Sequence, residues 1–181
     1  MLPTTLHPTL PNTPEEIVHW GQLHGCSQDL LLAQTAKHFE GLIVLVTADM
    51  NAAYKAELGI SYFIDKENIH VFPDWETLPY DVFSPLEDIV SDRLKTLALL
   101  PQTKQGILIV SAATLMHVLP PVDFIRANTL TLKTGDTLDI ELLREELDTS
   151  GYRNVSQVLE HGEYATRGSL IDLFPMGADH P

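Results

Sequence analysis

Three short apolar runs, separated by segments of helical pattern, constrain the fold of this chain more than any other feature. The runs cover residues 42–46, 69–72 and 107–110, and most of their side chains are β-branched or aromatic. Runs of this kind predict strands, and the continuous run over 42–46 predicts a strand covered on both faces. Strands that alternate with helices predict a parallel sheet, so the expected fold class is α/β.

Capping residues mark where the intervening helices are expected to begin. Asp49 precedes a helical pattern, and Ser84-Pro85-Leu86-Glu87 is a capping box with proline at the first helical position. Thr13 and Ser27 are interpreted as caps in the same way. The predicted helices cover residues 14–23, 27–40, 50–58, 85–100 and 112–118. The predicted apolar face of the fourth helix consists of Leu86, Ile89, Val90, Leu94, Leu97 and Ala98.

The pattern changes after Pro120-Pro121. The elements expected there are a strand over 129–132, a turn at Gly135-Asp136, a helix from Asp139 to Gly151 with Ile140, Leu143 and Leu147 on its apolar face, and two β-like stretches over 152–159 and 163–174. We therefore expect an extended lead-in over 1–13, an α/β domain over 14–120, and the start of a small, truncated α+β domain over 121–181.

Charge and composition disfavour several classes of function. The chain has 11 Lys and Arg against 25 Asp and Glu, a net charge of −14, so direct binding of DNA or RNA by this chain is disfavoured. The longest apolar run has five residues, far fewer than the roughly 20 needed to span a bilayer. Cys26 is the only cysteine and cannot form an internal disulfide. We expect a cytoplasmic protein without a membrane partner.

The segment around Gly25, Cys26 and Ser27 lies just before a helix and a buried strand, where a nucleotide-binding loop could be placed. A phosphate cradle needs a glycine-rich loop, a lysine for the β- and γ-phosphates and a Ser or Thr for magnesium. This segment has one glycine and no lysine, and Asp29 would repel a triphosphate. A plain helix N-terminus is favoured, and we expect this degenerate nucleotide loop to be inactive.

Acidic residues gather between Asp74 and Asp92, which could suggest a metal site. Glu87 and Asp88, however, lie in the first turn of a predicted helix, where negative charge favours the helix dipole. Helix caps and solvated faces are therefore favoured over a metal site. The eight histidines have no metal-ligand spacing, and no motif combines a nucleophile with a base. We expect no metal, no cofactor and no catalytic residue in this chain.

Two tracts combine residues in unusual ways. Residues 74–81 place Trp75 and Tyr80 in a loop with two prolines, for which local packing of the aromatic side chains is favoured over a direct contact role. Residues 160–175 predict a hairpin with Thr166-Arg167-Gly168 at its turn or edge. An arginine beside an apolar strand is typical of an edge that docks another protein.

On these two tracts the chain resembles the bacterial transcription-repair coupling factors, the Mfd family. The resemblance rests on residues 71–81 with Ser84-Pro85 and on residues 162–177, and it covers most of the chain from about Pro14. It implies a helicase-like α/β domain without a functional nucleotide site, followed by a small domain that mimics the UvrA-binding domain of the repair protein UvrB. UvrB itself retains the motif GxxGxGKT, which this chain lacks.

The resemblance also implies which residues bind UvrA. Arg153 and Arg167 match arginines on the exposed sheet of UvrB-like second domains, and Glu163 and Phe174 flank the same surface. Ala165 stands where UvrB has a further arginine, so the two sets of contacts differ.

The implied function is that of a non-catalytic adaptor, which recruits UvrA to stalled RNA polymerase in transcription-coupled nucleotide excision repair. The full protein would be an ATP- and magnesium-dependent DNA translocase that contacts RNA polymerase and DNA through other regions, and a later domain would mask the UvrA surface. The alternative is a degenerate helicase-type domain that still binds or hydrolyses ATP. The sequence leaves the oligomeric state open.

Overall fold

The chain folds into two compact units, each with its own core. The computed structural model describes residues 8–77, 82–130 and 132–181. The first unit consists of Met1–Asp74 and Gln102–His117, and the second of Trp75–Pro101 and Val118–Pro181. Residues 1–7 of the expected lead-in, and residues 78–81 of the aromatic tract, lie outside the described residues.

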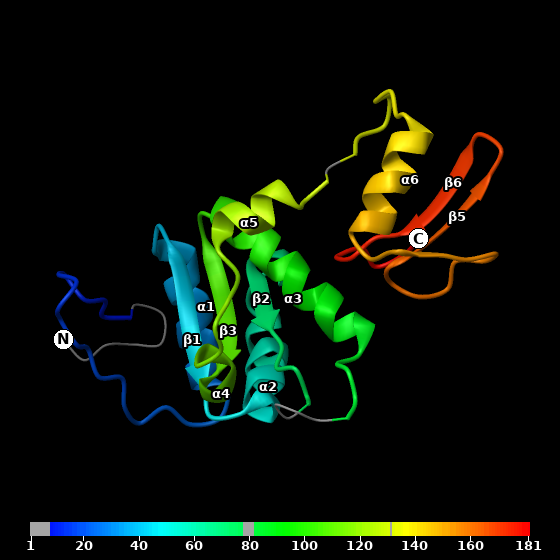
Figure 1. Ribbon diagram of the computed structural model, residues 1–181. Helices are drawn as coiled ribbons and strands as arrows, with labels where there is room; N and C mark the ends of the chain where they lie inside the picture. The colour runs from blue at the N-terminus through cyan, green and yellow to red at the C-terminus, as the bar shows by residue number, and fades with distance from the viewer. Residues whose placement is uncertain (1–7, 78–81, 131) are drawn as a thin grey trace. The chain divides into compact units, whose positions relative to one another are not determined.

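The first unit is built around a three-stranded parallel sheet in which β3 lies between β1 and β2. Figure 1 shows its elements, which are α1 (Ser27–His38), β1 (Leu42–Thr47), α2 (Met50–Ser61), η1 (Lys66–Asn68), β2 (Ile69–Phe72), β3 (Gly106–Ser111) and α4 (Ala112–Leu115). The three strands predicted before residue 120 and the parallel α/β class are confirmed. α4 is shorter than the helix predicted over 112–118. The helicase-like character of the fold stays a prediction.

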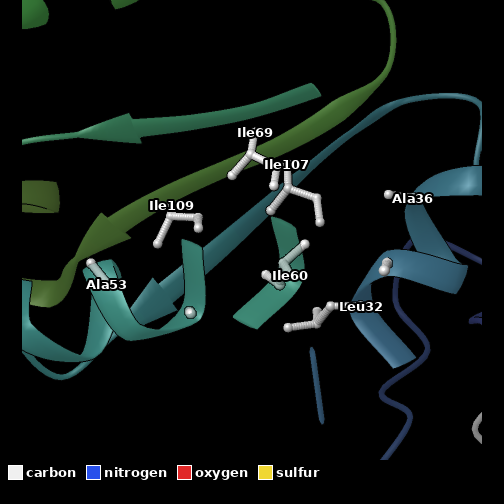
Figure 2. Close-up of a cluster of buried hydrophobic side chains, with 9 residues drawn as sticks. Leu32, Ala36, Ala53, Ile60, Ile69, Ile107 and Ile109 are labelled. Atoms are coloured by element: carbon white, nitrogen blue, oxygen red, sulfur yellow. The ribbon is translucent and has the colours of Figure 1, made fainter. Parts of the chain in front are cut away.

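The core of the first unit lies on one face of this sheet. Figure 2 shows side chains of α1, α2 and the strands meeting there, and its buried members are Leu32, Ala33, Ala36, Ala53, Ala56, Ile60, Ile69, Ile107 and Ile109. Side chains alternate across a strand, and the side chains of Val44 and Val46 in β1 are 49% and 48% exposed. The prediction that residues 42–46 are covered on both faces is therefore wrong, because β1 is an edge strand with a partly open face.

The helix starts of this part of the chain confirm one cap and correct two. The Asp49 side chain accepts a hydrogen bond from the Ala52 N–H at 2.8 Å, as an N-cap should. Ser27 is not a cap, because it lies inside α1 and its hydroxyl donates to the His24 carbonyl at 2.6 Å. The predicted capping box at Ser84 is also wrong. Leu86 is extended, so the helix that follows, α3 (Glu87–Leu99), begins only at Glu87 and has no side-chain cap.

No helix forms over residues 14–23, where one was predicted. The Glu16 N–H donates to the Thr13 carbonyl at 3.1 Å, and the Glu16 carboxylate accepts the Asn12 N–H at 2.6 Å, which makes a single turn. Gln22 then adopts φ +59, a left-handed conformation that a helix does not continue through. A helix of about ten residues is marginal unless it buries an apolar face, and Ile17 is 79% exposed.

The second unit contains a small mixed sheet with a helix against it. Its elements are α3 (Glu87–Leu99), α5 (Val122–Ala127), α6 (Ile140–Thr149), β4 (Arg153–Asn154), β5 (Glu163–Arg167) and β6 (Leu170–Phe174). η2 (Leu100–Gln102) lies where the chain returns to the first unit. β5 is central, parallel to β4 and antiparallel to β6, and α6 lies against this hairpin (Figure 1). Leu143, Leu147 and Tyr164 form the buried core, with Tyr152, Ile171 and Leu173 packed against it.

The predicted helix from Asp139 to Gly151 is confirmed as α6. The Asp139 carboxylate accepts the Glu141 and Leu142 N–H groups at 3.0 and 3.2 Å. Gly151 follows the helix with φ +86, a conformation that favours glycine. The predicted turn before the helix is also present, with Gly135 at φ +98.

The strand predicted over 129–132 does not form at residues 129, 130 or 132, and Thr131 lies outside the described residues. Asn128 and Thr129 instead end α5, a helix that was not predicted. Their side chains donate to the carbonyls of Phe124 and Ile125 at 2.8 and 2.7 Å. An alternating pattern makes a strand only where a neighbouring strand can pair with it, and here the local bonds to α5 are made instead.

The buried side of α3 differs from its predicted apolar face. Ser91, Arg93 and Thr96 are buried, whereas Leu86 and Leu94 of the predicted face are exposed. The Arg93 guanidinium lies 4.0 Å from the ring centre of Trp75, and the Ser91 hydroxyl accepts the Gly177 N–H at 2.8 Å. The predicted apolar face is wrong because Trp75 and Gly177, which lie against α3, interact with the polar side chains of Arg93 and Ser91. Local packing of Trp75 is confirmed, whereas Tyr80 lies outside the described residues.

No helix in the described part of the chain has the length and apolar character that crossing a membrane requires.

Candidate functional site

One face of the second unit's sheet brings together all four residues predicted to bind a partner. Arg153, Glu163 and Phe174 lie opposite one another on three neighbouring strands, and Arg167 lies four residues along β5 from Glu163. Residues at even spacing along a strand share a face. The opposite face carries Tyr164, which belongs to the core with α6. We call the first surface the outer face, and its residues are Arg153, Glu163, Ala165, Arg167, Leu170, Asp172 and Phe174.

Glu163 is the fixed centre of the outer face. Its side chain is 9% exposed. Oε2 accepts the backbone N–H groups of Leu159 and Glu160, each at 2.9 Å, and Oε1 lies 3.3 Å from Arg153 Nη2. These two backbone hydrogen bonds, and then the charge of Arg153, lower the pKa of Glu163 despite its burial. Because both carboxylate oxygens are occupied, the geometry of Glu163 favours a role in positioning Arg153 over direct contact with a partner.

Arg153 is more exposed and has two acidic neighbours. Its Nη2 lies 2.9 Å from Glu160 Oε2, and its side chain is 56% exposed. The hydrogen bond to Glu160, followed by the charges of Glu163, Glu160 and Glu87, raises the pKa of Arg153. The guanidinium is therefore a permanent cation held at a defined place on the sheet.

Arg167 stands at the end of the hairpin. It is exposed, and its Nη2 donates to the Ser156 carbonyl at 3.0 Å. The register pairs Arg167 with Leu170, so the turn consists of Gly168 and Ser169. Of the three residues predicted at the turn or edge, Gly168 lies in the turn, and Thr166 and Arg167 end β5. Gly168 has φ +63, a conformation that this tight turn requires and that favours glycine. Among the described residues Arg167 has no ion-pair partner, which leaves donors for an acceptor on another molecule.

Phe174 is held by a histidine that the sequence analysis did not single out. The rings of His161 and Phe174 are 4.0 Å apart between centroids. His161 in turn contacts Asp88 Oδ1 and the Ala178 carbonyl, each at 2.9 Å. His161 and Glu160 both lie within the tract 160–175, so their position in it was the only available signal. The partner of Glu160, Arg153, is seven residues away in the chain, whereas that of His161, Asp88, is 73 residues away.

An apolar hollow lies beside Arg167. This cavity of about 450 Å³ is lined by Leu132, Leu138, Leu143, Val158, Ile171 and Leu173, and also by Arg167 and Asp172. An apolar hollow with a cation and an anion on its lining can accept an apolar side chain while the charged groups orient the chain that carries it.

The segment considered as a nucleotide loop belongs to the first unit. Gly25 has φ +60, Cys26 is exposed and precedes α1, and the Ser27 hydroxyl donates to the His24 carbonyl. A P-loop lies between a strand and the following helix, but no strand occurs in the described residues 8–26. Burial raises the pKa of Asp29, which packs against Gly59 of α2.

No group of three or more potential metal ligands occurs within residues 8–77, 82–130 and 132–181.

Several known proteins are similar to this chain in sequence. Residues 130–181 match the family described as the UvrB interaction domain. The chain is 45% identical to the transcription-repair-coupling factor of Escherichia coli (strain K12) over 180 residues, which is 99% of this chain and 16% of that protein. The corresponding factor of Haemophilus influenzae (strain ATCC 51907 / DSM 11121 / KW20 / Rd) is 41% identical over 174 residues, 96% of this chain and 15% of that protein. The factor of Staphylococcus aureus (strain USA300) is 31% identical over 134 residues, which is 74% of this chain and 12% of that protein. The chain thus spans 16% or less of these relatives.

Proposed function

We propose a function for this chain from one premise: it belongs to the transcription-repair-coupling factor family. It corresponds to only part of the length of its relatives. The chain is an adaptor region that binds UvrA through the outer face of its second unit. In the intact protein this contact brings UvrA to stalled RNA polymerase in transcription-coupled repair. RNA polymerase, DNA, ATP and magnesium are bound by other regions, and the protein acts in the cytoplasm.

One observation carries this proposal. Residues 130–181, the part that matches the UvrB interaction domain, contain the outer face, on which Arg153, Arg167 and Phe174 lie together. The match points to a protein-binding role, and the shared face gives that role a surface.

The chemistry of this face favours a partner with carboxylate groups. Arginine presents its N–H donors in a planar fork, and such pairs with carboxylates are among the stronger hydrogen bonds in proteins. The chain as a whole is acidic, with a net charge of −14. The two arginines supply guanidinium groups on an otherwise acidic chain, and each can pair with a carboxylate of UvrA.

The test is the affinity of purified UvrA for this chain, measured by calorimetry. Replacing an arginine that pairs with a buried carboxylate costs about 2–5 kcal/mol of binding free energy. We expect Arg153→Ala and Arg167→Ala each to weaken binding by at least about tenfold, and the double variant to abolish it, while the circular dichroism spectrum stays unchanged. Arg126→Ala, at an exposed position of α5, is the matched control and should bind normally. Wild-type affinity in the double variant contradicts the proposal.

We further propose that this chain has no ATP chemistry of its own. The absence of a lysine near Gly25 and the hydrogen bond between Ser27 and His24 support this proposal. Calorimetry with ATP and magnesium tests it, and micromolar binding that is lost on substitution around Gly25 would favour the alternative of a nucleotide-binding domain.

A further inference from the structure

Arg153 is already paired in the free chain, and this pairing limits how a partner can reach it. Both of its ion pairs use the same nitrogen, Nη2, which lies 2.9 Å from Glu160 Oε2 and 3.3 Å from Glu163 Oε1. A terminal guanidinium nitrogen carries two N–H groups. One of them donates a hydrogen bond to Glu160 Oε2, and the Glu163 carboxylate lies at ion-pair distance from the same nitrogen.

A carboxylate that binds arginine through two parallel hydrogen bonds needs this nitrogen. Such a carboxylate uses either Nη1 with Nη2 or Nε with Nη2. A partner carboxylate that binds Arg153 in this way competes for Nη2 with Glu160, its hydrogen-bonded acceptor, and with the nearby Glu163.

The two glutamates differ in how firmly they are held. Glu163 is 9% exposed and is anchored by the N–H groups of Leu159 and Glu160, which would lose their acceptor if it moved. The Glu160 side chain is 65% exposed, so water can form hydrogen bonds to its carboxylate when it leaves Arg153. Glu160 is the group that can be displaced.

We propose that Glu160 occupies, in the free chain, the position on Arg153 that a carboxylate of the binding partner takes in the complex. This inference rests on the proposed function and adds a residue that changes the affinity for the partner. Glu160 weakens binding and restricts it to partners whose carboxylate competes successfully for Nη2, whereas Glu163 holds Arg153 in place and supports binding. The two neighbouring acids therefore act in opposite directions.

The experiment compares UvrA affinity for the wild-type chain and for Glu160→Gln, Glu163→Gln and Glu146→Gln by calorimetry. Exposed ion pairs are weak, so we expect Glu160→Gln to tighten binding by about two- to fivefold. Glu163→Gln should weaken binding. Glu146→Gln removes the same charge from an exposed position on α6 and should leave the affinity unchanged. Thermal unfolding of each variant establishes that it is folded.

The outcomes separate this inference from the function on which it rests. Tighter binding by Glu160→Gln alone supports it, because a merely structural role would not produce a gain. An equal gain in Glu146→Gln overturns it, since reduced overall repulsion would then explain both results. Unchanged or weaker binding by Glu160→Gln, with normal wild-type binding, overturns the inference and leaves the proposed function intact. Failure of the wild-type chain to bind UvrA overturns both.

Discussion

The two units of this chain are held together by different kinds of core. The core cluster of the first unit contains nine buried aliphatic side chains from two helices and a parallel sheet. The core cluster of the second unit consists of Leu143, Leu147 and Tyr164, and the Tyr164 hydroxyl donates to Asp148 Oδ1 at 2.6 Å while accepting from Asn154 Nδ2 at 3.3 Å. The first core cluster consists of aliphatic side chains, whereas the second includes a tyrosine whose hydroxyl makes two hydrogen bonds.

This difference follows from how much of each sheet's surface is available for the core. The sheet of the second unit exposes charged groups on its outer face, so only one side of each strand is available for the core. A small sheet with one apolar face buries little surface, and a buried hydroxyl with fixed partners adds both stability and a defined geometry. A unit can therefore be small and still hold the residues of its outer face in fixed positions.

The largest expected effect comes from breaking the apolar core. Ile107 is fully buried in the central strand of the first unit, and Ile107→Ala should lower the free energy of unfolding by about 2–5 kcal/mol because it leaves a cavity. Urea denaturation measures this loss, with Ile17→Ala at an exposed position as the control. If the cores are separate, amide exchange in β5 should change far less than in β3. Equal loss of protection in both strands contradicts the comparison.

A smaller effect is expected from removing the hydrogen bond between Tyr164 and Asp148. Tyr164→Phe keeps the ring in the second core but removes the hydroxyl that bonds to Asp148, which should cost about 1–2 kcal/mol. Exposed Tyr62 provides the matched change, and Tyr62→Phe should have little effect on urea denaturation. A stability unchanged by Tyr164→Phe would mean that packing alone suffices in this core too.

The smallest expected effect is that of pH, which should act in opposite directions on the two units. Burial raises the pKa of Asp29 in the first unit, so its contribution to stability is fully present below the unfolded value of about 3.8 and is lost as the pH rises through the folded pKa. Hydrogen bonds lower the pKa of Glu163 in the second unit, so its contribution is present above about 4.5 and is lost as the pH falls through the folded pKa.

Hydrogen exchange between pH 6 and pH 3.5 measures these two contributions, each against its own neutral variant. On acidification the wild-type first unit should gain stability relative to Asp29→Asn, and the wild-type second unit should lose stability relative to Glu163→Gln. The same direction of change in both units would show that these carboxyl groups do not dominate the pH dependence.

Local sequence signals predicted the elements whose determinants lie close together in the chain. The strands of the first unit, the cap at Asp49 and the helix from Asp139 to Gly151 are confirmed for this reason. The helix over 14–23 and the strand over 129–132 were wrong, because a cap or an alternating pattern forms a regular element only when neighbouring elements cover it. The buried face of α3 was wrong because Arg93 is buried against Trp75, eighteen residues away in the chain.

The sequence by itself determined the parallel α/β layer and nominated Arg153, Glu163, Arg167 and Phe174, since periodicity, caps and the resemblance of two tracts depend on residues that are near in the chain. Only the tertiary structure placed these four residues on one face and gave each its contacts. Strand register aligns Arg153 with Glu163 and Phe174, and backbone N–H groups fix Glu163 while Glu160 stays exposed. Hydrogen-bond partners and burial depend on which strands are neighbours in space, and that is decided by the folded chain as a whole.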